Sequence, residues 1–101
     1  MKRTLENIKY KESTEDLALF AKALGHPTRI AILKYLENQS CCYTGDLVDI
    51  FPLAQSTISQ HLKELKNAGL IQGELKPPKI KYCINKENWS NAKALFSEFF
   101  S

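Results

Sequence analysis

The most constraining feature of this sequence is a pair of helical patterns that are separated by only three residues. Residues 45–51 are rich in apolar side chains and are followed by Pro52, which disfavours helical backbone in the residue before it. The second helical pattern covers residues 55–68. A short helix, a tight connection and a longer second helix are the parts of a helix-turn-helix motif.

The second helix has one apolar face and one polar face. Ile58, Leu62 and Leu65 fall at i, i+4 and i+7, which places them on the same side of a helix. The opposite side collects hydroxyl and amide side chains and one lysine: Ser56, Ser59, Gln60 and Lys63. Such groups bond to base edges and phosphates when a helix lies in the major groove of DNA. For this segment taken alone, an ordinary surface helix with a solvated polar face is the alternative.

After the second helix the pattern changes to strands. Residues 70–75 and 79–84 are strand-like, and a stiff turn that contains two prolines separates them, so we expect a hairpin, or wing. Residues 54–86 hold six lysines against two glutamates, within a chain of net charge +3. This distribution suits a polyanionic partner. The wing lysines expected to contact phosphates are Lys76, Lys79 and Lys81.

The N-terminal third contains two more amphipathic patterns. The first covers residues 14–24, with Thr14 as its cap and Gly25 after its end. His26 caps the next helix, and Pro27 is its first residue. The predicted core positions of that helix are Ile30, Ala31, Leu33 and Leu36. Its charged residues are expected to point away from the core: Arg29 and Lys34.

The last helix, residues 86–100, carries much aromatic surface for the end of a chain. Four large or apolar side chains recur at intervals of three and four residues and form a seam along one side. We expect this seam and the helix of residues 14–24 to form a dimer interface, because other side chains can fill the centre of so small a domain. Packing onto the domain's own core is the alternative. The predicted interface comprises Leu17, Phe20, Leu24, Trp89, Ala92, Phe96 and Phe99.

These elements predict one mainly α-helical domain, residues 14–101, behind a flexible arm of residues 1–13. The fold class is a winged helix-turn-helix with about five helices and a two- to three-stranded antiparallel sheet. The sequence has no apolar run near the roughly 18 residues of a membrane span, and the arm has no apolar core of a signal peptide. We therefore expect a cytoplasmic protein without a membrane partner. An enzyme is not expected, because neither histidine has an evident catalytic partner.

Four segments carry a family resemblance. They are Ala23-Leu-Gly-His-Pro-Thr-Arg-Ile-Ala-Ile-Leu33, Gly45-Asp-Leu, Gln55-Ser-Thr-Ile-Ser-Gln-His-Leu-Lys-Glu-Leu65 and Ala68-Gly-Leu-Ile71. Together they closely resemble the ArsR/SmtB family of bacterial and archaeal winged-helix repressors, from about residue 14 to residue 84. The resemblance implies a sequence-specific DNA-binding regulator, a homodimeric repressor that binds an inverted repeat of double-stranded DNA and is released by an inducer. A winged-helix module that binds proteins without reading DNA is the alternative.

The resemblance also assigns the DNA-contacting residues. They are Gln55, Ser56, Thr57, Ser59, Gln60, His61 and Lys63, together with the three wing lysines. His61 lies at the margin of the apolar face, so holding the helix to its neighbour is the alternative role for this side chain.

The three cysteines depart from the family's sensing patterns. Many members carry Cys-x-Cys before the first motif helix, whereas the aligned positions here are Cys42 and Thr44. Residues 86–101 contain neither His nor Asp, so the family's other metal site is absent. A short strand before residue 45 would pair with the second wing strand and bring Cys41 or Cys42 towards Cys83. Such thiolates could bind arsenite or a soft metal ion, or oxidise to a disulfide; buried cysteines in a regulator that has lost sensing are the alternative.

Overall fold

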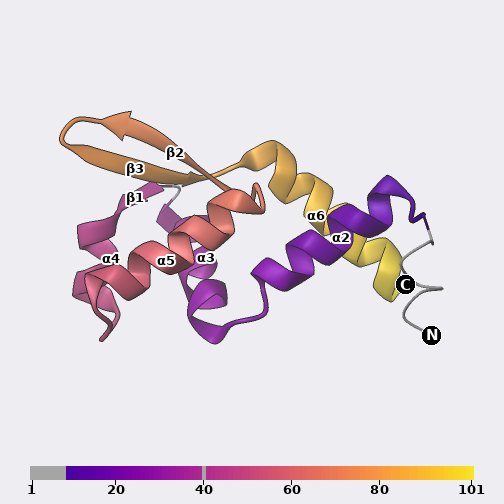
Figure 1. Ribbon diagram of the computed structural model, residues 1–101, viewed down its shortest axis with the longest axis horizontal. Coiled ribbons are helices and arrows are strands. Elements are labelled where there is room, and N and C mark those ends of the chain that lie inside the picture. Colours follow the sequence, from indigo (N-terminus) through magenta and orange to yellow (C-terminus); the bar gives the residue numbers. More distant parts are fainter. Residues whose placement is uncertain (1–8, 40) are drawn as a thin grey trace.

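The computed structural model describes residues 9–39 and 41–101, and its helices and strands follow the predicted order (Figure 1). They are α2 (Glu12–Ala23), α3 (Pro27–Gln39), β1 (Cys41–Tyr43), α4 (Thr44–Ile50), α5 (Gln55–Asn67), β2 (Ile71–Lys76), β3 (Lys79–Ile84) and α6 (Lys86–Phe100). Within the described residues there are five helices and one three-stranded antiparallel sheet, which confirms the predicted fold class. Most of the predicted arm, residues 1–8, lies outside them.

The core forms where α5 crosses α3 and α4. The predicted apolar face of α5 is fully buried at Ile58, Leu62 and Leu65. The prediction for α3 is wrong at Ile30, which is 41% exposed, while Ile32 is buried instead. Residues 30–33 are all apolar, so the sequence alone fits two different helix faces. The largest fully buried side chains are Ile32, Leu33, Leu36, Leu47, Ile58, Leu62, Leu65, Leu70 and Ile71.

The wing follows directly from the end of α5. Gly69 has a φ of +82°, a left-handed conformation that glycine adopts without steric cost, and it turns the chain into β2. β2 starts one residue later than predicted, so that Lys76 ends the strand instead of starting the turn. β3 lies between β2 and the short β1. Because side chains alternate along a strand, Cys42 and Ile71 face the core while the lysines lie on the outer side.

The terminal helices α2 and α6 lie side by side at the end of the molecule away from the helix-turn-helix (Figure 1). α2 starts at Glu12, with Lys11 as its cap, and not at Thr14 as predicted. Two glutamates in its first turn, Glu12 and Glu15, favour the earlier start because their charges oppose the positive end of the helix dipole. None of the helices in the described ranges is long and apolar enough to cross a membrane.

Candidate nucleic-acid interface

The polar face of α5 is open to solvent along its length. The core side of the helix is fixed by burial of its apolar residues, so the opposite side must face outwards. The exposed residues are six of the seven that were predicted on this helix: Gln55, Ser56, Thr57, Ser59, Gln60 and Lys63. These side chains offer hydroxyl and amide groups and one cation on a surface of one helix. This combination can donate and accept hydrogen bonds at base edges.

Gln60 is held by a neighbour that the sequence analysis did not single out. Its Nε2 donates to Glu64 Oε1 at 3.2 Å, one turn further along α5. The i, i+4 spacing of the two residues is the sequence pattern that could have indicated this bond. The glutamate therefore orients the amide and also places a negative charge at the edge of the polar face.

His61 is the predicted DNA contact that the structure places elsewhere. Its side chain is 8% exposed and faces the body of the protein, where Arg29 Nη1 lies 3.3 Å from His61 Nδ1. The ring of His26 lies 4.5 Å away, between ring centroids. Burial, followed by the neighbouring charges of His26 and Arg29, lowers the pKa of His61. The alternative role of holding the helix to its neighbour fits this position, and a contact with DNA does not.

Arg29 is a second correction, because it was expected to point away from the core. Its guanidinium is half-buried, and its Nε donates to the backbone carbonyl of Ala23 at 2.6 Å. His26 behaves as predicted: its Nδ1 accepts a hydrogen bond from Thr28 N at 3.0 Å, which caps α3. Arg29 lies in the first turn of α3, shortly after the predicted end of the preceding helix. This closeness was the one indication in the sequence that the Arg29 side chain could reach unpaired carbonyls.

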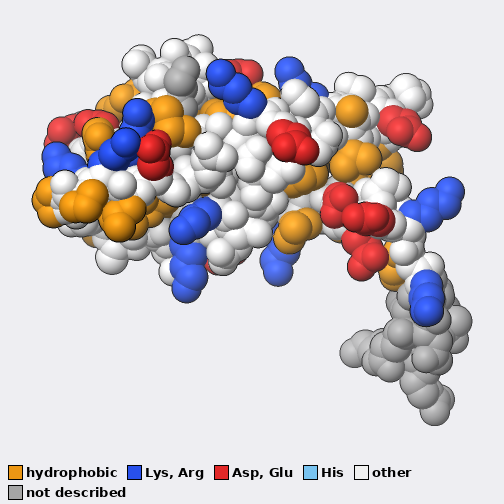
Figure 2. All heavy atoms as spheres, turned by 90° about the horizontal axis from the view of Figure 1, so that it is seen from above, with side chains coloured by type: hydrophobic (Ala, Val, Ile, Leu, Met, Phe, Trp, Pro, Cys, Tyr) orange, Lys and Arg blue, Asp and Glu red, His pale blue; other side chains and the backbone are white. Residues whose placement is uncertain are grey.

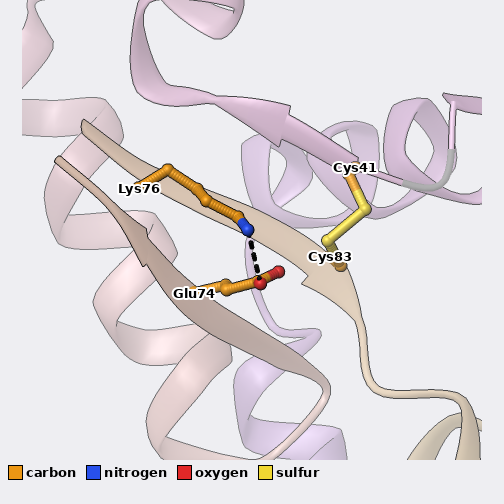
Figure 3. A network of polar contacts seen from close by, with 4 residues as sticks. All are labelled: Cys41, Glu74, Lys76 and Cys83. Atoms are coloured by element: carbon orange, nitrogen blue, oxygen red, sulfur yellow. Dashed lines mark ion pairs between the residues drawn. A yellow bond between two sulfur atoms is a disulfide. The ribbon is translucent and has the colours of Figure 1, made fainter. Parts of the chain in front are cut away.

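The three wing lysines differ in the contacts that their side chains make within the protein. Lys76 forms an ion pair with Glu74 at 3.0 Å (Figure 3). This bond lowers the pKa of Glu74 and raises the pKa of Lys76. Lys79 Nζ lies 5.4 Å from the ring centroid of Tyr43, within cation–π range. Lys81 lies directly across the sheet from Glu74 and Tyr43.

A groove separates the wing from the helix-turn-helix. Its volume is about 660 Å³, and α4, α5, β1 and the wing all contribute to its walls. Gln55 and Ser59 line it on the side of α5, and Lys79 lines it on the side of the wing. Base-reading and phosphate-binding candidates thus border one open surface. The acidic members of its lining are Asp46 and Asp49 of α4.

Two of the three cysteines are joined. Cys41 of β1 and Cys83 of β3 are register partners whose Cα atoms lie 4.1 Å apart, and a disulfide connects them (Figure 3). Cys42 points to the opposite face, is buried in the core and is free. Its burial, with a contribution from Asp46, raises its pKa to about 11. Within the described residues, no group of three or more His, Cys, Asp or Glu side chains could hold a metal ion.

The α2/α6 pair presents a second surface, which is apolar. Figure 2 shows hydrophobic side chains over these helices and also at the wing end, at both places among charged side chains. Phe99 is 66% exposed and Phe100 is 76% exposed. A groove of about 350 Å³ lies between the end of α2 and α6, with Leu24, Trp89 and Phe96 in its walls. Of the predicted interface residues, Phe20 and Ala92 are already buried within the single chain.

The chain matches known proteins in sequence and in structure. Residues 26–72 match the model of the family described as bacterial regulatory protein, arsR family. The HTH-type transcriptional regulator YgaV of Escherichia coli is 36% identical over 75 residues, which cover 74% of this chain and 76% of that protein. The repressor SmtB of Mycobacterium tuberculosis is 44% identical over 64 residues, 62% of this chain and 46% of that protein. The structure of the repressor PagR of Bacillus anthracis superimposes with a TM-score of 0.68 at 28% identity, covering 81% and 95% of the two chains.

Proposed function

Because this chain belongs to the ArsR family of bacterial regulatory proteins, we propose that two copies of it bind an inverted-repeat operator and repress transcription in the cytoplasm. The family consists of transcriptional regulators, and the chain is a DNA-binding regulator with a winged helix-turn-helix. The observation that supports operator binding most directly is the polar face of α5. This face is exposed along its length, while the opposite face is completely buried.

In this proposal α5 lies in the major groove and its exposed side chains read the bases. Ser59 and Gln60 lie centrally on the polar face, where an amide can bond two groups of one base. The wing lysines contact phosphates beside the groove, which fixes the register without reading sequence. His61 takes no part in these contacts, since it is buried against Arg29.

The proposed homodimer uses the exposed part of the α2/α6 surface. Leu19 of α2 is 47% exposed, and Phe99 and Phe100 of α6 are 66% and 76% exposed, so both terminal helices present large apolar side chains to solvent. Exposed apolar side chains of this size favour burial against a partner. Phe20 and Ala92 instead hold α2 and α6 together within each copy. The predicted interface is thereby reduced to its half-buried and exposed members: Leu17, Leu24, Trp89, Phe96 and Phe99.

We also propose that the Cys41–Cys83 pair regulates DNA binding by oxidation and reduction. The two sulfurs lie at the edge of a surface depression of about 730 Å³, where small reagents have access. A hydroperoxide transfers one oxygen to one thiolate, which gives a sulfenic acid and an alcohol or water; the second thiol then displaces water and forms the disulfide. Two thiols of a reductant reverse the step by exchange and leave as their own disulfide.

The bridge connects the two parts of the proposed interface. Cys41 lies three residues before α4, and Cys83 belongs to the wing. The disulfide therefore fixes the wing against the helix-turn-helix. We expect the oxidised protein to bind DNA more tightly, because its contact groups need less ordering on binding.

The function is tested by fluorescence anisotropy of the purified protein with its own promoter region and with a scrambled duplex. Tighter binding of the promoter, lost in Gln60→Ala, together with the mass of a dimer, supports the proposal. Binding that ignores sequence and survives Gln60→Ala and Ser56→Ala indicates a protein-interaction module instead.

The regulation is tested in the same assay after treatment with hydrogen peroxide or with a phosphine reductant. Reduction should weaken binding of the wild type and leave Cys41→Ser and Cys83→Ser unchanged. Cys42→Ser is the matched control and should respond as the wild type does. Equal affinity of the two wild-type states would exclude the redox proposal. Arsenite and cadmium added to the reduced protein test whether the two thiols bind a soft ion instead.

A further inference from the structure

The recognition helix α5 is tied by polar contacts to both terminal helices. α2 and α6 lie side by side at one end of the molecule, apart from the helix-turn-helix (Figure 1). Their position relative to α5 is therefore set at the junction between these two parts. Arg29 and Asn88 provide side-chain hydrogen bonds at that junction, and neither residue belongs to the exposed face of α5 or to the wing.

Arg29 connects the end of α2 with the middle of α5. Its Nε donates to Ala23 O at 2.6 Å and its Nη2 to Lys22 O at 3.4 Å. These carbonyls lie in the last turn of α2, where the helix itself no longer supplies a donor for every acceptor. Lys22 O also accepts from the backbone N–H of Gly25 at 3.1 Å, so Ala23 O is the main acceptor for Arg29. The third nitrogen, Nη1, lies 3.3 Å from Nδ1 of His61 on α5. One guanidinium thus contacts two helices that are far apart in the sequence.

His61 is suited to receive this bond. A guanidinium can only donate, so Nδ1 of His61 must accept and the ring must be neutral at that nitrogen. Burial and the nearby His26 and Arg29 lower the pKa of His61, which favours the neutral ring. The ring of His26 packs against His61 from the segment between α2 and α3, at 4.5 Å between centroids.

Asn88 connects the start of α6 with the end of α5. Its Nδ2 donates to Gly69 O at 2.9 Å, while its backbone N–H donates to the cap residue Asn85. A Cβ at Gly69 would lie 2.7 Å from Asn88 Nδ2, closer than real contacts allow. The left-handed φ of Gly69 excludes most side chains as well. Glycine at this position therefore lets the amide approach the backbone where the recognition helix ends.

We propose that Arg29 and Asn88 are positioning residues that set the operator spacing this protein accepts. The inference rests on the proposed homodimer: if α2 and α6 form the dimer interface, their angle to α5 determines the distance between the two recognition helices. Apolar contacts tolerate small rotations, whereas these hydrogen bonds are directional. Loss of either bond therefore frees the recognition helix to pivot, without removing a group that contacts DNA.

The test measures affinity for a series of operators that share two half-sites and differ in the spacer between them. Each added base pair moves the half-sites by about 3.4 Å and rotates them by about 35°, since one turn is about 34–36 Å and 10–10.5 base pairs. The wild type should show a sharp optimum. In Arg29→Gln, the preference for the optimum over spacers two base pairs longer or shorter should fall by about tenfold, the lower value for a hydrogen bond to a charged group. In Asn88→Ala it should fall by about fivefold, the typical value for a hydrogen bond between neutral groups.

The controls separate positioning from general stability. Lys34→Gln removes a cation from an exposed position of α3, and Asn91→Ala removes an exposed amide from α6, so both should keep the wild-type spacing profile. Arg29→Lys keeps the positive charge but loses the planar guanidinium with its several donors, so its spacing profile should resemble that of Arg29→Gln. The lysine variant replaces the glutamine variant in the test if the latter does not fold. Variants whose affinity falls equally at every spacing would overturn the inference and leave the proposed function intact. A wild type without any spacing optimum would overturn both.

Discussion

The phosphate contacts proposed for the wing make a quantitative prediction for Lys79→Ala. Each phosphate neutralised on duplex DNA contributes about 0.9 to the slope of log affinity against log salt concentration. A homodimer has two wings, so this change should reduce the slope by about 1.8. Between about 50 mM and about 200 mM salt, the variant should therefore lose about twelvefold less affinity than the wild type does. Anisotropy titrations over that salt range measure both slopes.

The geometry of the wing supplies the controls for this experiment. Lys79 is exposed and loses only its cation–π contact with Tyr43, so the free energy of unfolding should change by about 1 kcal/mol or less. Lys34→Ala removes a cation of α3 that is also exposed and is not among the proposed DNA contacts, so it should leave the slope unchanged. Glu74→Gln releases Lys76 from its ion pair and should increase the slope. The reasoning is refuted if Lys79→Ala and Lys34→Ala change the slope by the same amount.

Three further predictions concern α5. Gln60→Ala should lower discrimination at particular base pairs by about 1–3 kcal/mol, measured against single-base operator variants; a uniform loss over all sequences would contradict the assignment. The folded pKa of His61 lies below its ordinary 6.5, so its neutral form stabilises the fold above that pH and the stabilisation is lost as pH falls. Urea unfolding at several pH values should show this decrease, and His61→Gln should reduce it. Leu62→Ala should cost about 2–5 kcal/mol of unfolding free energy by the same method, since Leu62 is fully buried.

Elements of this fold that rest on local patterns could be predicted from the sequence. The apolar spacing of α5 fixed which side is buried, and Gly69 marked its end because a left-handed residue commonly ends a helix. Alternation predicted that one of the two adjacent cysteines faces Cys83, and Cys41 does so. For α5 and Gly69, neighbours within a few residues carry the physical cause. For the cysteines, alternation is local, but the pairing of Cys41 with Cys83, 42 residues away, followed from the expected winged-helix sheet.

Contacts between distant elements could not be predicted in the same way. Arg29 is separated from His61 by 32 residues, and the carbonyls that it binds become available only when α2 ends beside α3. Asn88 was hidden for a similar reason, because its partner is a backbone oxygen without a side-chain signature. The ion pair of Glu74 with Lys76 is local, yet a net count of charge hid it by treating every wing lysine as free.

The contact between Arg29 and His61 joins two of the segments that carry the family resemblance. His26-Pro-Thr-Arg29 follows the end of α2 and starts α3, while Ser56-Thr-Ile-Ser-Gln-His-Leu62 presents the polar face. The structure brings one residue of each motif together, Arg29 and His61, and His26 packs on the same ring. Their pairing needs both motifs at compatible positions in the fold. A chain with only the second motif would have a polar recognition helix without the contact that orients it towards the terminal helices.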